Sequence, residues 1–191
     1  MRPTLVIMVK EPRPGRVKTR LGRDIGMVAA AWWFRHQSAR LIRRLTDRRW
    51  RLVLAVSPDV EGLASRVWPE TLARVPQGAG DLGDRMGRVF RSLPPGPVVI
   101  IGADIPDIAP PHIAEAFNAL GQADAVLGPA PDGGYWLVGL ARRQAVPARL
   151  FDGVRWSTAH ARLDTEASMF GLRIARVATL RDVDTAADLS R

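Results

Sequence analysis

The sequence is 191 residues long, 47% hydrophobic and free of cysteine, and its formal net charge is +9. That length suits one domain with a full hydrophobic core, so we expect a single domain over residues 1–191. The absence of cysteine excludes disulfides, thiolate metal sites and cysteine nucleophiles. No apolar run is long enough to cross a bilayer, and the first one, Leu5–Val9, lacks the flanks of a secretion signal. We therefore expect a cytoplasmic protein with no membrane partner.

Apolar runs of strand length alternate along the chain with segments of helical spacing. The predicted order is strand Thr4–Val9, helix Asp24–Thr46, strand Arg51–Val56, a short helix from Pro58, strand Arg74–Pro76, helix Asp84–Leu93, strand Val98–Ile101, helix Pro111–Leu120, strands Ala125–Leu127 and Tyr135–Leu140, helix Ala159–Phe170, strand Ile174–Ala178 and a short helix from Thr185. This alternation predicts an α/β fold, a three-layer α/β/α sandwich around a mostly parallel central sheet.

The strand Val98–Ile101 carries the strongest functional signal. Its four apolar residues are typical of a strand buried on both faces, and Asp104 follows just past its carboxyl end, where open α/β sheets bind their ligands. Asp107 comes one turn later, after Pro106 has ended the strand. Two carboxylates in such a turn suit Mg²⁺ or Mn²⁺ beside a phosphate. The ligand role is favoured for Asp104, whereas Asp107 is equally well explained as a cap of the next helix.

The loop after the first strand carries Lys10 and Lys18, the two lysines among the 28 basic residues of the chain. Free backbone amides and converging cations favour an anion there, and a compact ammonium in an arginine-rich protein indicates a specific role. The loop does not have the Walker A pattern. We predict that it binds phosphate and is more than a basic surface. Its candidate nucleotide-binding residues are Lys10, Gly15, Lys18, Thr19 and Arg20.

Two glycine-rich loops follow later strands. Gln77–Gly83 contains three glycines, which let a base or a phosphate lie against the backbone, although a flexible connector would have the same composition. Gly128–Gly134 is either a plain hairpin turn or a loop that receives a substrate hydroxyl. The candidate nucleotide-binding residues of the glycine-rich loop Gln77–Gly83 are Gln77, Gly78, Asp81 and Gly83. The candidate substrate-binding residues are Asp107, Asp132, Gly133, Gly134 and Tyr135.

A last pair of acids follows the final predicted strand. Asp182 and Asp184 alternate along an extended segment and so share one side of it. One of them is therefore predicted to face a metal at Asp104. Asp184 is the first choice and Asp182 the alternative, and a helix cap is the other explanation for Asp184.

Four segments together resemble a known family. They are Lys10–Leu21 (Lys-x-Pro-x-Pro-Gly-x-Val-Lys-Thr-Arg-Leu), Asp81–Met86, Gly102–Asp107 and Gly128–Tyr135. They resemble, in order and over nearly the whole chain, a bacterial family of glycosyltransferases assigned by similarity, with the GT-A or nucleotide-diphospho-sugar transferase fold. Some members are labelled arsenosugar-biosynthesis glycosyltransferases. The family is related to phospholactate guanylyltransferase and to the molybdenum-cofactor guanylyl- and cytidylyltransferases.

The resemblance implies a nucleotide over the first loop, with Lys18 and Arg20 near its phosphates. It also implies metal binding by Asp104 and by the segment Asp182–Thr185. The residues that would line the acceptor side are Gly133, Gly134 and Tyr135. Two segments differ from the wider superfamily: 104–107 is not a literal D-x-D, and a proline-bearing lysine loop replaces the glycine-rich opening of sugar nucleotidyltransferases.

The leading hypothesis is a metal-dependent transferase that moves a glycosyl group from a nucleotide-sugar to a small acceptor. Lys18 and Asp104 are its candidate catalytic residues. Mg²⁺ or Mn²⁺ on Asp104 and Asp184 would neutralise the leaving diphosphate. The alternative is nucleotidyl transfer from an NTP to a phosphorylated small molecule, with release of pyrophosphate. A nucleic-acid-binding protein would explain the charge, but no nucleic-acid motif accompanies it. The expected partners are thus a nucleotide or nucleotide-sugar and a small acceptor, with a homodimer left open.

Overall fold

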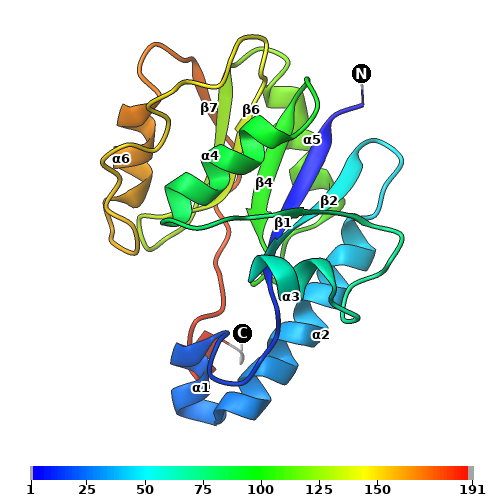
Figure 1. The fold of residues 1–191 in the computed structure, drawn as a ribbon. Coiled ribbons are helices and arrows are strands. Elements are labelled where there is room, and N and C mark those ends of the chain that lie inside the picture. Colours follow the sequence, from blue (N-terminus) through cyan, green and yellow to red (C-terminus); the bar gives the residue numbers. More distant parts are fainter. Residues whose placement is uncertain (1, 189–191) are drawn as a thin grey trace.

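The computed structural model describes residues 2–188, in which helices cover both faces of a seven-stranded sheet (Figure 1). The strands are β1 Thr4–Lys10, β2 Arg51–Ser57, β3 Ala73–Pro76, β4 Val98–Gly102, β5 Ala125–Pro129, β6 Tyr135–Leu140 and β7 Ile174–Arg176. The helices are α1 Thr19–Ile25, α2 Met27–Leu45, α3 Asp59–Leu63, α4 Leu82–Ser92, α5 Pro110–Ala119, α6 Ala161–Ser168 and the short 3₁₀ helix η1 Ala186–Asp188.

The predicted mostly parallel sheet is confirmed, in the strand order β3-β2-β1-β4-β6-β5-β7. β1 pairs in parallel with β2 and β4, β3 pairs in parallel with β2, and β7 pairs in parallel with β5. β6 runs antiparallel between β4 and β5. Because parallel strands end at the same edge, the loops that follow β1, β2 and β4 lie side by side there.

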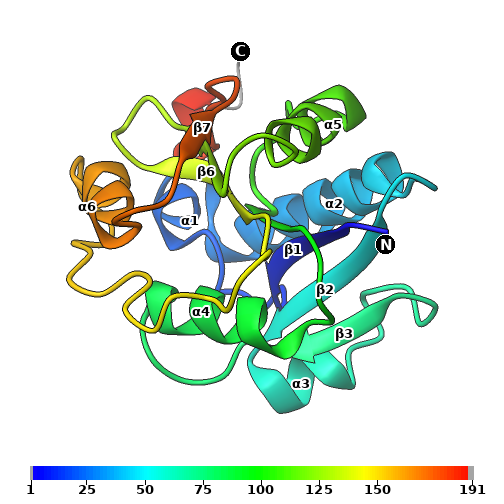
Figure 2. The ribbon, with the colours of Figure 1, turned by 90° about the horizontal axis from the view of Figure 1, so that it is seen from above.

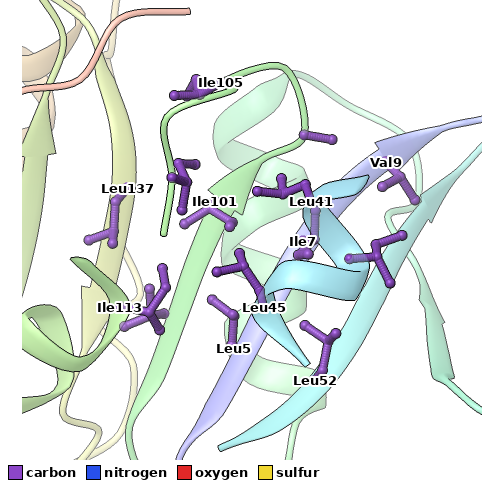
Figure 3. Close-up of a cluster of buried hydrophobic side chains, with 14 of the residues drawn as sticks. Leu5, Ile7, Val9, Leu41, Leu45, Leu52, Ile101, Ile105, Ile113 and Leu137 are labelled. Atoms are coloured by element: carbon purple, nitrogen blue, oxygen red, sulfur yellow. The ribbon is translucent and has the colours of Figure 1, made fainter. Parts of the chain in front are cut away.

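The three predicted layers are also confirmed. Helices α2 and α5 pack on one face of the sheet, and α4 and α6 pack on the other (Figure 2). Alternating residues of β1 serve both layers, as the period of a strand requires. Leu5 and Ile7 join Leu41 and Leu45 of α2 (Figure 3), whereas Val6 belongs to the opposite cluster.

Strand β4 is buried on both faces, as its sequence predicts. Each of the four residues Val98–Ile101 is at most 2% exposed. Their apolar side chains hold the strand firmly between β1 and β6, since burial of such a side chain is worth about 1.5–3 kcal/mol. The chain then leaves the sheet at Gly102, and Asp104 follows at the carboxyl edge.

The helix expected over Asp24–Thr46 is found as α2, but it begins at Met27, and Thr19–Ile25 form a separate helix, α1, that the sequence did not predict. Gly26 has φ +92° and separates α1 from α2. Its N–H donates to Gly22 O and its own carbonyl accepts from Ala30 N, both at 3.0 Å. Apolar spacing continues through this glycine, so periodicity alone does not reveal the break. Among residues 2–188, no helix is both long enough and apolar enough to span a bilayer.

Candidate active site

The carboxyl edge of the sheet carries a cleft of about 630 Å³ with Asp104 in its wall. Two neighbouring cavities, of about 280 and 330 Å³, also include Asp104 in their linings. The cavity of about 280 Å³ lies over the ends of β1 and β4. The cavity of about 330 Å³ lies against the start of α1 and the loop that joins β1 to α1, called the first loop below. Asp104 therefore stands where three hollows meet, as expected for a ligand-binding residue after a central strand.

Three carboxylates gather in this cleft. One oxygen each of Asp104, Asp182 and Asp184 lies within 4.8 Å of the other two. The backbone holds the two distant segments together, because Val183 N–H donates to Asp104 O at 3.2 Å. Both acids considered at the C-terminal end of the chain thus lie beside Asp104.

Lys18 is the cation at the centre of this cluster. Its Nζ lies 2.6 Å from Asp104 Oδ2 and 3.1 Å from Asp184 Oδ1, and it donates to Val183 O at 2.6 Å. The Lys18 side chain is 8% exposed. Burial lowers the pKa of Lys18, but the carboxylates of Asp104 and Asp184 outweigh that effect and hold the pKa above its ordinary value. The ammonium therefore stays charged at neutral pH.

Helix α1 fastens the first loop to the C-terminal segment. Lys18 precedes α1 with left-handed backbone angles, φ 44° and ψ 48°. Arg20, the second residue of α1, places its Nη1 3.1 Å from Asp184 Oδ2. Asp24 Oδ2 accepts from Ala186 N at 3.0 Å, so the last described turn packs on α1 (Figure 1). The acids and the cations of the site are thus placed by contacts between opposite ends of the chain.

The cluster fits a divalent cation. Burial raises the pKa of Asp182, and the nearby carboxylates of Asp184 and Asp104 raise it further, against the opposing effect of Lys18. The three carboxylates also outnumber the two cations that contact them, Lys18 and Arg20. Carboxylate oxygens are the donors that Mg²⁺ and Mn²⁺ prefer. Asp104, Asp182 and Asp184 could hold such an ion.

The remaining first-loop candidates divide between the cleft and its surroundings. Lys10, Thr19 and Arg20 line the cavity of about 330 Å³ together with Lys18. Gly15 is in none of the three linings, and its φ of +74° shows that it serves the turn of the loop.

The glycine-rich loop after β3 has mainly structural contacts. Gln77 is buried, and its side-chain amide donates to Val9 O and Ala55 O, which ties the ends of β1 and β2 together. Gly78 N–H donates to Asp59 Oδ1 at 3.0 Å, and the loop closes over that contact. Gln77 also lines the cavity of about 280 Å³. Among the four candidate nucleotide-binding residues of this loop, Gln77 alone is in the lining of any of the three cavities.

Asp81 and Gly83 are explained without a ligand. Asp81 caps α4, because its Oδ1 accepts from Asp84 N at 2.9 Å while Asp84 Oδ2 accepts from Asp81 N at 3.1 Å. A side chain at Gly83 would press on Phe151 and Trp156. These two positions, which the sequence offered as nucleotide contacts, shape the helix that borders the cleft.

The Asp132–Tyr135 segment forms another wall of the cleft. Asp132 Oδ1 accepts from Gly134 N at 2.9 Å, which closes the turn before β6. Tyr135 accepts at its hydroxyl oxygen from Thr165 Oγ1 at 3.2 Å, and burial raises its pKa above the ordinary value. Asp132, Gly134 and Tyr135 all line the cleft. Tyr135 thus stays neutral at physiological pH and contributes an uncharged hydroxyl and ring to the wall.

Gly133 lies at a close contact between two loops, which gives a stability prediction. It has φ +87°, and an added Cβ would overlap the carbonyl oxygen of Ala159. Gly153 has φ +71° with nothing nearby. Gly153→Ala should destabilise the protein by about 1 kcal/mol through backbone strain alone. Gly133→Ala should cost about 1–3 kcal/mol more through overlap. Thermal unfolding of both variants checks this, and equal losses would contradict the close contact.

Asp107 stands outside the site. It is exposed, it is in none of the three linings, and it does not cap α5, whose N-cap is Ala109. The helix-cap explanation is therefore wrong, and the structure gives no support to a ligand role for Asp107. The sequence also missed the far wall of the cleft, formed by Trp156, Ser157 and Thr158 before α6. Ser157 has φ +60°, unusual for a residue with a side chain.

Comparison with known proteins identifies the family of the chain and a solved structure with a similar fold. The model of a family described as "uncharacterized protein conserved in bacteria (DUF2064)" matches residues 41–158, more than half of the chain. A crystal structure of a "putative nucleotide-diphospho-sugar transferase" from Desulfovibrio desulfuricans G20 has a TM-score of 0.87 and 32% identity, over 98% of this chain and 84% of that one. No curated protein sequence matches the chain.

Two more distant structures share the fold. Rv0371c from Mycobacterium tuberculosis H37Rv, solved as a complex with manganese, has a TM-score of 0.57 at 14% identity, over 100% of this chain and 97% of that one. The 4-diphosphocytidyl-2C-methyl-D-erythritol synthase of Anaerococcus prevotii DSM 20548 has a TM-score of 0.60 at 11% identity, over 99% and 93%. The predicted nucleotide-diphospho-sugar transferase type of fold is confirmed.

Proposed function

The chain belongs to the bacterial family DUF2064, and from this membership and the cleft geometry we propose that it is a metal-dependent transferase with a nucleotide-activated donor. The favoured reaction is glycosyl transfer from a nucleotide-sugar to a small acceptor. The observation that carries the proposal is the meeting of Asp104, Asp182 and Asp184 with the buried ammonium of Lys18. Cations beside a carboxylate cluster at a strand edge suit a metal-bound diphosphate.

Each group has a role in this proposal. Asp104, Asp182 and Asp184 would hold Mg²⁺ or Mn²⁺, and when bound that ion supplies positive charge to the leaving diphosphate. Lys18 and Arg20 would contact the phosphates, because both line the cavity against the first loop. The cavity of about 280 Å³ would take the base, since its lining is largely apolar and ends at Lys10 and Gln77. With the metal, the phosphates and the base placed in this way, the far wall of the main cleft is left for the acceptor.

Nucleotidyl transfer remains the second candidate. Its support is the fold shared with the Anaerococcus synthase, which is named for a diphosphocytidyl compound. In that version Lys18 and Arg20 would contact the leaving pyrophosphate. The two reactions differ in their products, a nucleoside diphosphate in the first and pyrophosphate in the second.

The decisive experiment is a thermal-shift screen of NTPs and nucleotide-sugars, each with and without Mg²⁺ or Mn²⁺. We expect stabilisation by at least one nucleotide that depends on the metal, because ligand bound to the folded state raises the melting temperature. Product analysis with that nucleotide then separates the two reactions. No shift with any nucleotide, together with salt-dependent binding of oligonucleotides, would favour the nucleic-acid alternative instead.

The proposed metal cluster also predicts non-additive substitutions. Asp104→Asn and Asp184→Asn should each weaken Mn²⁺ binding, but the double variant should be little worse than either single one, because both oxygens serve one ion. Asp182→Asn combined with Asp104→Asn should behave in the same way. Calorimetric titration of the parent, the three single variants and the two double variants with Mn²⁺ measures this. Fully additive losses for both pairs would place the C-terminal segment outside the site.

A further inference from the structure

The far half of the cleft differs in charge from the donor side. We call its lining the acceptor wall, formed by Asp132, Gly134, Tyr135 and the segment 156–158. Four carboxylates line the cleft as a whole, those of Asp104, Asp132, Asp182 and Asp184. Arg20 is the one cation among the lining residues that the structure describes, and it is paired with Asp184 at 3.1 Å. The acceptor wall itself contributes an acid and no base.

The described lining of the cleft has no unbalanced positive charge that could attract an anionic acceptor. Arg20 and Lys18 provide two positive charges against the four carboxylates, and a divalent ion would provide the other two. The phosphates of the donor then add negative charge where Lys18 and Arg20 would contact them, and Lys10 and Arg16 in the same lining would balance that charge. A phosphorylated or carboxylated acceptor would find no further cation in the cleft, and like charges at close range repel.

Arg155 and Arg162, which flank the segment 156–161 in sequence, are each held in an ion pair. Arg155, next to Trp156, binds Asp164 through Nε at 2.8 Å and Nη2 at 2.9 Å. The hydrogen bond from Arg155 lowers the pKa of Asp164 to about 2, so this pair stays ionised at neutral pH. Arg162 Nη1 lies 2.7 Å from Glu166 Oε1. Neither guanidinium is in the lining of the cleft.

What the wall offers suits hydroxyl groups and C–H faces. Asp132 uses Oδ1 for Gly134 N–H, and a carboxylate accepts through both oxygens, so Oδ2 can accept from a hydroxyl. Thr158 fixes the opposite loop, donating to Arg155 O and accepting from His160 N. The rings of Tyr135 and Trp156, 6.4 Å apart and edge to face, add apolar surface between these polar groups.

We propose that the acceptor is an uncharged polyhydroxy compound, a sugar or a polyol, and neither a phosphate ester nor a carboxylate. This inference rests on the proposed transferase function. The acceptor hydroxyl oxygen forms the new bond to the sugar carbon as the bond from that carbon to the diphosphate oxygen breaks. The nucleoside diphosphate leaves with the electron pair of that bond, and the hydroxyl proton passes to solvent beside Asp132.

Matched acceptor pairs test the proposal. The full-length protein with Mn²⁺ and the nucleotide-sugar that stabilises it is given glucose or glucose 6-phosphate, and glycerol, glycerol 3-phosphate or glycerate. Release of nucleoside diphosphate is measured at equal acceptor concentrations. We expect the neutral member of each set to accelerate release at least about tenfold more than its charged partner. Equal effects within every set, including no effect, or a preference for the charged member would overturn the proposal.

Asp132→Asn gives an independent check. It removes the charge of the acceptor wall while keeping its shape, so the preference for neutral over charged acceptors should fall several-fold. Asp152→Asn, an exposed acid outside the cleft, is the matched control and should leave that ratio unchanged. An unchanged ratio in Asp132→Asn would show that the wall charge does not select the acceptor. Failure of every nucleotide to bind would instead refute the transferase function itself.

Discussion

Asp104→Asn is expected to abolish metal-dependent nucleotide binding while the fold remains intact. The amide keeps the shape of the carboxylate but loses a charge at the point where all three cavities meet. Substitutions one shell beyond a metal ligand already cost 10–100-fold in metal affinity, so loss of a ligand should cost about 100-fold or more. Calorimetry with Mn²⁺ and the stabilising nucleotide measures the loss, and circular dichroism checks the fold.

Asp107→Asn is the natural control for that experiment. Asp107 lies three residues further along the same turn, is exposed and is outside the cleft lining, so its amide variant should bind nucleotide and metal like the parent protein. If Asp104→Asn also binds both as tightly as the parent, the metal centre proposed at Asp104 is wrong. If Asp107→Asn is the damaged variant, the acid that follows β4 has been misassigned.

The part of the site at the carboxyl edge of the sheet was predictable from the sequence, because a buried apolar run indicates a central strand and the residues after it lie at that edge. A doubly buried apolar run such as Val98–Ile101 indicates a central strand, and an acid just after it must then lie at the ligand-binding edge. The same rule places the first loop, after Thr4–Lys10. The C-terminal acids were harder, since nothing local shows that the segment at Asp184 returns to β4. Their alternation on an extended chain supplied the hint.

The remaining parts of the site depend on contacts that local patterns do not encode. Asp81 resembled a ligand contact because it belongs to a glycine-rich segment, yet its carboxylate is satisfied by the N–H of Asp84. Gly83 is explained by close packing against Phe151, from a segment almost seventy residues away. The wall at 156–158 has no regular structure and no spacing signal, so only the folded chain brings it opposite Asp132.

Lys18→Met should separate two roles of the buried ammonium. The Nζ of Lys18 contacts the oxygens of Asp104 and Asp184 that a divalent ion would also need. Without nucleotide, the variant should therefore bind Mn²⁺ several-fold more tightly than the parent, because a competing positive charge has gone. With nucleotide the sign reverses. Loss of a charged contact to phosphate is worth roughly 1.5–3 kcal/mol, so di- and triphosphates should bind far more weakly, whereas nucleosides should be little affected.

Arg20→Met is the matched control, because it removes the same charge from a side chain that is 66% exposed and that contacts Asp184 but not Asp104. Its effect on Mn²⁺ alone should be smaller than that of Lys18→Met, since an exposed pair is weak. The two lysines of the chain also allow a direct observation. In protein labelled with ¹³C at lysine, the Lys18 side-chain signal should shift when Mg²⁺ is added without nucleotide, while the exposed Lys10 signal stays nearly constant. Equal losses of nucleoside and nucleotide affinity in Lys18→Met, with no Lys18 shift, would mean that the ammonium holds the loop to Val183 and touches neither metal nor phosphate.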